Sequence, residues 1–125
     1  MERFYGKARH DQILGPIFVD AIGDQWDSHL ATMQTFWCTV MFNTGTYKGN
    51  PLAAHMRLPG LTERHFRRWL SLWRETVAEV CGSEGTLFVC RAEAIGERLL
   101  AAVSLRDTHI QIAAKTRNRE ARRAE

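Results

Sequence analysis

Apolar residues along this chain recur mostly at steps of three and four, the spacing of one face of an α-helix. The clearest stripe lies between residues 24 and 43 and contains Trp26, Leu30, Met33, Phe36, Trp37, Val40 and Met41. A second stripe lies between residues 62 and 82 and contains Phe66, Trp69, Leu70, Trp73, Val77 and Val80. No segment shows the convincing alternation of a half-buried strand. The pattern therefore predicts an all-α protein.

Start and stop signals divide the chain into about five helices. The segments predicted to be helical are 2–10, 24–43, 51–57, 62–82 and a last helix that begins at residue 83 or 86. The first ends before Leu14-Gly15-Pro16, because a residue that precedes proline is disfavoured in the helical region. Asp24 and Thr62 are expected to cap the second and fourth helices, and Pro51 suits the first turn of the third. Residues 43–50 read as a loop.

The length of 125 residues indicates a single globular unit, and 25% charged residues is ordinary for a soluble domain. No apolar run approaches the about 20 residues that span a bilayer, and the N-terminal residues lack the apolar segment of a secretory signal. The three cysteines, Cys38, Cys81 and Cys90, form no CxxC motif. They are interpreted as small buried hydrophobic residues in a reducing compartment, which predicts a cytoplasmic protein that does not bind membranes.

The basic charge is concentrated at the C-terminal end. The last eleven residues carry two glutamates and five basic side chains, Lys115, Arg117, Arg119, Arg122 and Arg123, which accounts for the whole net charge of +3. A nucleic-acid-binding arm is one interpretation, but a neutral body favours a solvated extension and no nucleic-acid partner. We therefore expect a domain over residues 1–106 and a basic tail over residues 107–125, which either extends the last helix or is disordered.

Two histidines lie among apolar residues. His29 shares a helix face with Met33 and Phe36, and His55 lies in the short helix that follows Pro51. A hydrogen-bonded core histidine is the ordinary interpretation of such a position. Two histidines 26 residues apart, without HExxH or a third convergent ligand, do not make a zinc signature. They suit a haem iron, which takes one axial imidazole and faces a polar residue on its other side.

The four tryptophans are a heavy aromatic load for a small core, and indicate either a well-filled core or a pocket for a large flat ligand. An ordered set of motifs then connects the chain to a family: Phe4-Tyr5, Leu14-Gly15-Pro16-Ile17-Phe18, Trp26-x-x-His29, Phe36-Trp37, Tyr47-x-Gly49-x-Pro51, His55-x-x-Leu58-Pro59 and His65-Phe66-x-x-Trp69-Leu70. With these spacings, residues 4–80 resemble the group III truncated haemoglobins, and Arg91-Ala92 and Ile95 continue the match more weakly. The resemblance implies a globin-like two-over-two helical sandwich around haem b, in which the family's first helix has no counterpart before residue 4.

The resemblance also implies roles for individual residues. His55 matches the proximal histidine, which bonds the haem iron and is the metal ligand. Should His55 fail in this role, His65 is the next candidate, although its place in the first turn of a helix suits a cap better. Six further haem-contacting residues are implied: the polar distal residues Tyr5, His29 and Trp69, the haem-stacking Phe18, the distal-face Met33, and Trp37 at the inner end of the pocket.

Several hydrogen-bond donors on the distal side predict slow release of a bound ligand. We therefore expect a monomeric globin that binds O2, NO, CO, cyanide or sulfide for redox, detoxifying or sensing chemistry rather than bulk O2 transport. Whether it is an enzyme, such as an NO dioxygenase or a peroxidase, stays open, and turnover would need an unidentified reductase. The alternative is a cofactor-free helical interaction domain whose basic tail contacts an acidic partner.

Overall fold

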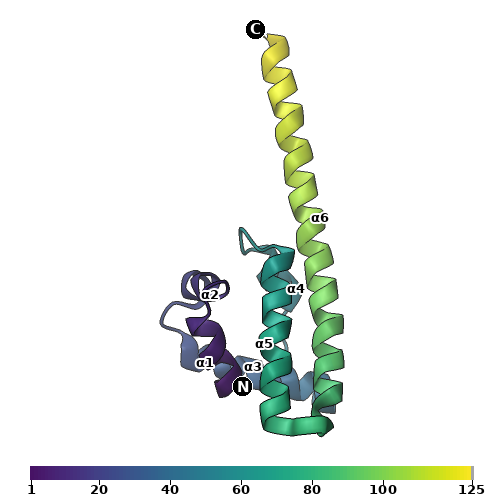
Figure 1. Ribbon diagram of the computed structural model, residues 1–125. Coiled ribbons are helices and arrows are strands. Elements are labelled where there is room, and N and C mark those ends of the chain that lie inside the picture. The colour runs from purple at the N-terminus through teal and green to yellow at the C-terminus, as the bar shows by residue number, and fades with distance from the viewer. Residues whose placement is uncertain (125) are drawn as a thin grey trace.

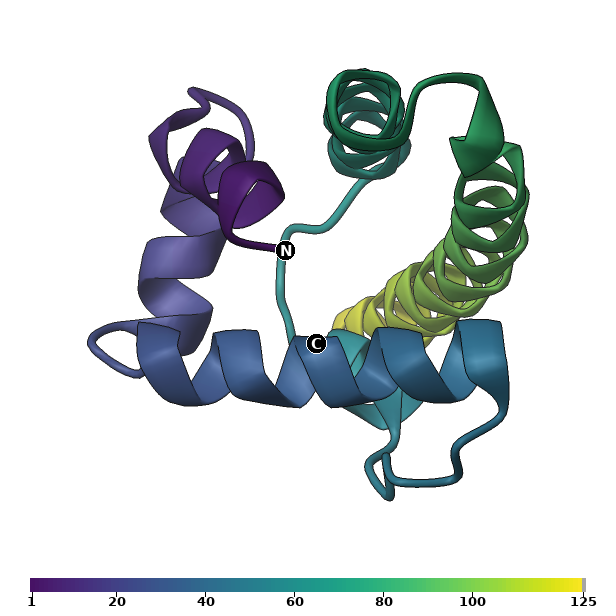
Figure 2. The same ribbon diagram turned by 90° about the horizontal axis from the view of Figure 1, so that it is seen from below.

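The computed structural model describes residues 1–124, which fold as helices joined by short connections. The elements in chain order are α1 (Glu2–His10), α2 (Gly15–Ile22), α3 (Trp26–Phe42), α4 (Pro51–Met56), α5 (Glu63–Cys81), the 3₁₀ helix η1 (Gly82–Gly85) and α6 (Thr86–Ala124). α5 and α6 lie side by side and run antiparallel, and α6 projects far beyond the other helices (Figure 1). α3 runs across one end of this pair, and α1 and α2 lie on the side of α5 that is opposite to α6 (Figure 2). The all-α prediction is confirmed.

Local signals explain where α4 and α5 begin. Pro51 occupies the first turn of α4, and the side chain of Asn50 accepts a hydrogen bond from Ala53 N at 3.1 Å. Thr62 is the N-cap of α5, as predicted, and its backbone N–H donates to Nδ1 of His65 at 3.1 Å. Each cap satisfies a backbone N–H group that the start of the helix leaves free. In the cap of α5, the imidazole of His65 is the acceptor.

Two expectations about the N-terminal half are wrong. The segment Gly15–Ile22 forms the helix α2, because Pro16 occupies the favoured first turn of a new helix after α1 has already ended at His10. The N-cap of α3 is Gln25 rather than Asp24, and the carboxylate of Asp24 accepts from the Gln25 side chain at 3.2 Å instead.

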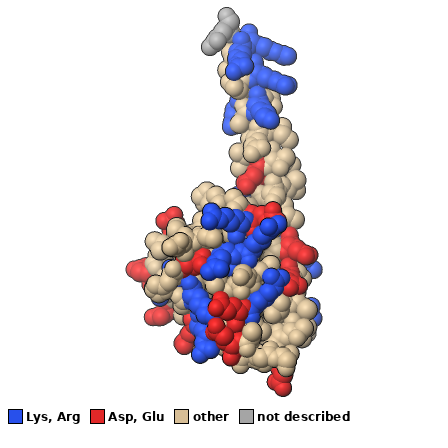
Figure 3. All heavy atoms as spheres, in the orientation of Figure 1, with Lys and Arg blue, Asp and Glu red and all other residues tan. Residues whose placement is uncertain are grey.

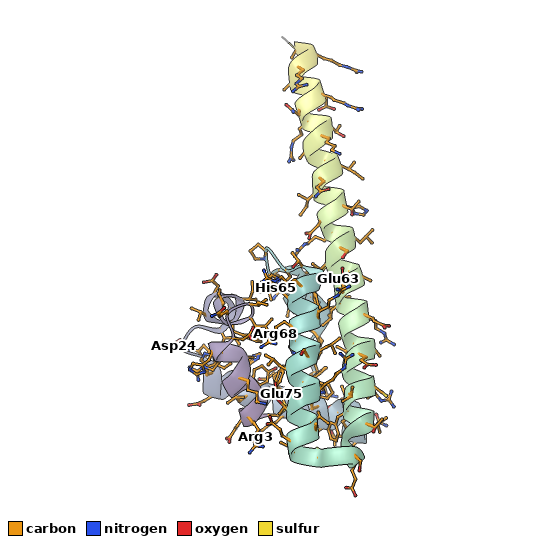
Figure 4. All side chains as sticks on the ribbon, in the orientation of Figure 1. Arg3, Asp24, Glu63, His65, Arg68 and Glu75 are labelled. Carbon is orange, nitrogen blue, oxygen red and sulfur yellow. The ribbon has the colours of Figure 1, made fainter. Side chains whose placement is uncertain are left out.

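The corner between α1 and α2 is held by Asp11. Its carboxylate accepts hydrogen bonds from the backbone N–H groups of Ile13 and Leu14, both at 3.1 Å, and from Nε of Arg68 at 2.7 Å. Arg68 stands on the side of α5 that faces this corner (Figure 4). At Gly15 a Cβ would lie 2.8 Å from the carbonyl oxygen of Arg9, so only glycine allows the two helices to approach this closely. The corner therefore fixes α1 and α2 relative to α5.

The buried residues form two clusters, one centred on Phe4, Trp37 and Trp73 and the other on Phe66 and Val103. The prediction that the cysteines are buried is wrong: Cys38 and Cys90 are exposed, and Cys81 is half-buried. Trp37 and Ala92 take the inward positions beside the two exposed cysteines. All three thiols are free.

The projecting part of α6 makes no core contact. Val103 is the last buried residue of the helix, and every side chain from residue 108 to 124 is exposed. Lys and Arg side chains crowd the far end (Figure 3), whereas acidic and basic side chains alternate over the rest of the displayed face. The helix thus continues through the predicted tail, apart from Glu125, which lies outside the described residues. Within residues 1–124, none of the helices combines the length and hydropathy that crossing a bilayer requires.

Candidate functional site

Two short connections bring Tyr5, Phe18, Trp26 and His29 together from α1, α2 and the start of α3. The Tyr5 ring lies 5.2 Å from the His29 ring, 5.8 Å from Phe18 and 6.2 Å from Trp26, measured between centroids. All three contacts are edge-on, an arrangement that aromatic rings favour. Three residues of the predicted site are therefore neighbours in space.

The hydroxyl of Tyr5 has no hydrogen-bond partner within residues 1–124, although the Tyr5 side chain is only 5% exposed. Every fully buried side-chain nitrogen or oxygen atom in that range has a hydrogen-bond partner, so the unpaired hydroxyl of Tyr5 is not fully buried. The hydroxyl therefore opens onto accessible space. Burial raises the pKa of Tyr5 well above its ordinary value, so the group stays protonated and is available as a donor.

His29 of α3 is half-buried. Burial lowers its pKa, and the charge that His55 of α4 carries when protonated lowers it further. A lowered pKa keeps the imidazole of His29 neutral at pH 7, with one N–H donor and one acceptor. His29 can therefore serve as a hydrogen-bond donor from a half-buried position.

His55 is oriented by its own helix. Its Nδ1 lies 2.6 Å from the carbonyl oxygen of Pro51, one turn earlier, so Nδ1 carries the proton and donates it. The remaining nitrogen, Nε2, then holds a lone pair, as a metal ligand requires. A carbonyl partner of this kind fixes the tautomer and raises the basicity of a ligating imidazole.

The tryptophans of α3 and α5 form a stack. Trp37 lies 4.4 Å from Trp73, and Trp73 lies 6.0 Å from Trp69, with the rings nearly parallel in both pairs. The indole N–H of Trp73 donates to the carbonyl oxygen of Phe88 at 3.2 Å. The N–H of the partly exposed Trp69 has no such partner within residues 1–124. Trp37 and Trp73 are thus core residues, whereas Trp69 keeps a donor free.

The residues present fit a haem. Many large apolar side chains around the histidines stay partly exposed, which leaves apolar surface for a flat ligand: Phe18, Leu30, Met33, Phe36, Trp69 and Ile95. Among the described residues, no three His, Cys, Asp or Glu side chains gather as a metal site would require. One free imidazole nitrogen among apolar side chains therefore suits iron that arrives within a macrocycle, not a bare ion.

Sequence reasoning missed residues that act only through tertiary contacts. Trp26 is buried against Tyr5 and His29, and the guanidinium of Arg9 lies 4.3 Å above its ring. Arg106 of α6 reaches the end of α4. The motif Trp26-x-x-His29 marks Trp26 in the sequence, but nothing local marks the two arginines.

The all-α fold, in which α3 crosses the antiparallel pair α5 and α6, is that of a globin. The chain is 40% identical over 87 residues to the group 3 truncated haemoglobin of Campylobacter jejuni, covering 67% of this chain and 68% of that protein. The structure matches the crystal structure of group III truncated haemoglobin from C. jejuni with a TM-score of 0.78 and 35% identity, covering 82% of this chain and 84% of that one. No family model matches the sequence. The chain belongs to the group III truncated haemoglobins, a membership that implies haem as the cofactor and a small gas as the ligand.

Proposed function

We propose that this chain binds haem b with Nε2 of His55 as the axial ligand of the iron, and holds a small ligand beneath Tyr5, His29 and Trp69. Support for the axial role comes from the 2.6 Å bond between His55 Nδ1 and the Pro51 carbonyl, which leaves Nε2 free. Support for the distal role comes from the absence of protein partners for Tyr5 and Trp69 within residues 1–124. Phe18, Met33 and Trp37 are proposed to pack around the haem.

When bound, the haem iron supplies ligand binding and one-electron chemistry. The chain's own contribution is a set of donors: the O–H of Tyr5, the N–H of Trp69 and one N–H of neutral His29. A hydrogen bond to a charged acceptor contributes about 1.5–3 kcal/mol. Two or three such bonds in a low-dielectric pocket strengthen one another and slow the release of a polar ligand.

Slow release favours chemistry on the ligand over its delivery. We therefore propose a redox, detoxifying or sensing role, with O2, NO, CO, cyanide or sulfide as ligands and an electron-donating protein as the reductase. Nitric-oxide dioxygenation is the first activity to test: the oxygenated protein is mixed with NO and nitrate is measured. Nitrate formed in proportion to the protein supports NO dioxygenation. O2 release as fast as that of a transport globin contradicts the broader redox, detoxifying or sensing role.

The axial assignment is tested by His55→Gly, which removes the imidazole without adding a competing group. We expect the variant to lose most of its Soret absorbance and to regain part of it when free imidazole is added. His65→Ala is the matched control, because His65 holds the α5 cap and should retain haem when replaced. Full haem occupancy with an unchanged spectrum in His55→Gly would sink the assignment.

A further inference from the structure

An arginine from α6 closes the end of the helix that carries His55. Nη1 of Arg106 lies 2.9 Å from the carbonyl oxygens of both Met56 and Leu58. The remaining guanidinium nitrogens bond Asp107, with Nε at 2.9 Å and Nη2 at 2.8 Å from its carboxylate. The Arg106 side chain is only 15% exposed, so these bonds are largely shielded from water.

Apart from Met56 and Leu58, which pack partly buried against the cluster of Phe66 and Val103, few other contacts hold α4 in place. It is six residues long and contains no buried residue. Asn50, Pro51 and His55 bond only within the helix and its cap, and the carbonyl oxygens of Ala54 and His55 accept from Arg57 and Leu58. In the part of the chain that the structure describes, Arg106 is the one side chain from another helix that hydrogen-bonds α4 or the turn after it. A cation at a helix C-terminus is also favoured by the helix dipole.

We propose that Arg106 is a positioning residue for His55: by bonding the Met56 and Leu58 carbonyls it fixes the orientation of α4, and with it the direction of Nε2. The inference rests on the proposed axial role of His55. Because a six-residue helix depends on tertiary contacts for its order, loss of these bonds allows α4 to rotate and loosen. The direction in which Nε2 points and the hydrogen bond from Nδ1 to the Pro51 carbonyl would then no longer be fixed.

The test compares Arg106→Met with Arg106→Lys and with Arg98→Met, an exposed position on the same helix. Arg106→Met retains the apolar stem of the side chain but donates no hydrogen bond, whereas lysine can still donate to one carbonyl. Three properties are measured in the purified proteins: the iron–histidine stretching band of the ferrous form, the rate of haem transfer to an acceptor apoprotein, and amide exchange over residues 51–58 without haem.

We expect Arg106→Met to shift or broaden the iron–histidine band and to speed haem transfer and amide exchange by about tenfold or more, since charge-assisted bonds are lost. Arg106→Lys should fall between the wild type and Arg106→Met, and Arg98→Met should match the wild type. An unchanged band and haem-transfer rate in Arg106→Met overturns the proposal, even if the variant melts earlier, because that result leaves only a structural role. If Arg106→Met does not fold, Arg106→Lys decides by the same criterion. Failure of the axial assignment is separate, since His55→Gly would then retain its Soret band.

Discussion

Replacing Tyr5 with phenylalanine separates ligand retention from protein stability. The hydroxyl has no protein partner within residues 1–124, so its removal breaks no intramolecular hydrogen bond. The ring remains, with its edge-on contacts to Phe4 at 5.0 Å, Phe18 at 5.8 Å and His29 at 5.2 Å. We therefore expect the free energy of unfolding to change by less than about 0.5 kcal/mol.

Ligand release should change far more. If Tyr5 donates to a charged or strongly polar ligand, its loss removes about 1.5–3 kcal/mol of stabilisation. Since about 1.4 kcal/mol corresponds to tenfold, the O2 dissociation rate should rise between about tenfold and about 150-fold. Stopped-flow replacement of O2 by CO measures this rate directly, and urea unfolding of the same samples measures stability.

Tyr47→Phe is the matched control for Tyr5→Phe. Tyr47 lies on the loop 43–50, its ring packs 5.1 Å from Phe36, and its hydroxyl has no hydrogen-bond partner in the described region. It should leave both O2 dissociation and stability unchanged. The reasoning is refuted if Tyr5→Phe leaves the dissociation rate unaltered, or if the control raises it equally. A loss of more than about 2 kcal/mol of stability in Tyr5→Phe would show instead that the hydroxyl holds the fold.

Three further predictions address other parts of the molecule. Trp69→Phe should raise the O2 dissociation rate by about tenfold with little change in stability, whereas Trp73→Phe should chiefly destabilise, because Trp73 donates to Phe88; stopped-flow and urea unfolding of both variants check the contrast. Burial opposes ionisation of Asp11, but the bonds from Arg68, Leu14 and Ile13 prevail and hold its pKa below the ordinary value. The wild type should therefore be more stable than Asp11→Asn above about pH 4, and this difference should vanish as the pH falls below that value and the carboxylate is protonated in both states; unfolding measured from pH 7 to pH 2.5 tests the window. A chain that ends at Asp107 should retain haem and its thermal midpoint, since every side chain from 108 to 124 is exposed; a lower midpoint or lost haem would contradict the proposed division at residues 106 and 107.

The elements that follow a simple local pattern could be predicted from the sequence. The apolar spacing predicted α3 and α5, and Pro51 predicted the start of α4. The ordered motifs predicted the family, which the comparisons confirm. His55 could be singled out because it lies among apolar residues in the short helix that follows Pro51, and in the structure its Nδ1 lies 2.6 Å from the Pro51 carbonyl oxygen.

What the sequence did not predict depends on distant contacts or on competing local signals. Pro16 was interpreted only as a helix breaker, but α1 ends earlier, at His10, and Pro16 instead starts α2, which was missed. Cys38 and Cys90 share helices with core residues, but the helix face that packs is decided by neighbouring helices, and both thiols lie outside. Arg106 and Met56 are 50 positions apart, and no local pattern predicts that they meet.

The residues proposed to face the haem lie on the short helices α1, α2 and α4 and on the longer α3 and α5, and this division has consequences for how the pocket moves. α1, α2 and α4 contain nine, eight and six residues, lengths at which an isolated helix is marginal. Each side of the pocket is tied to the long pair by an arginine: Asp11 on the α1–α2 corner bonds Arg68 of α5, and the end of α4 bonds Arg106 of α6. Because α5 and α6 supply both anchors, loosening one anchor should free one side of the pocket and leave the other in place. The proposed distal donor Tyr5 and the proposed axial imidazole of His55 are thus held by separate polar contacts on a shared helical frame.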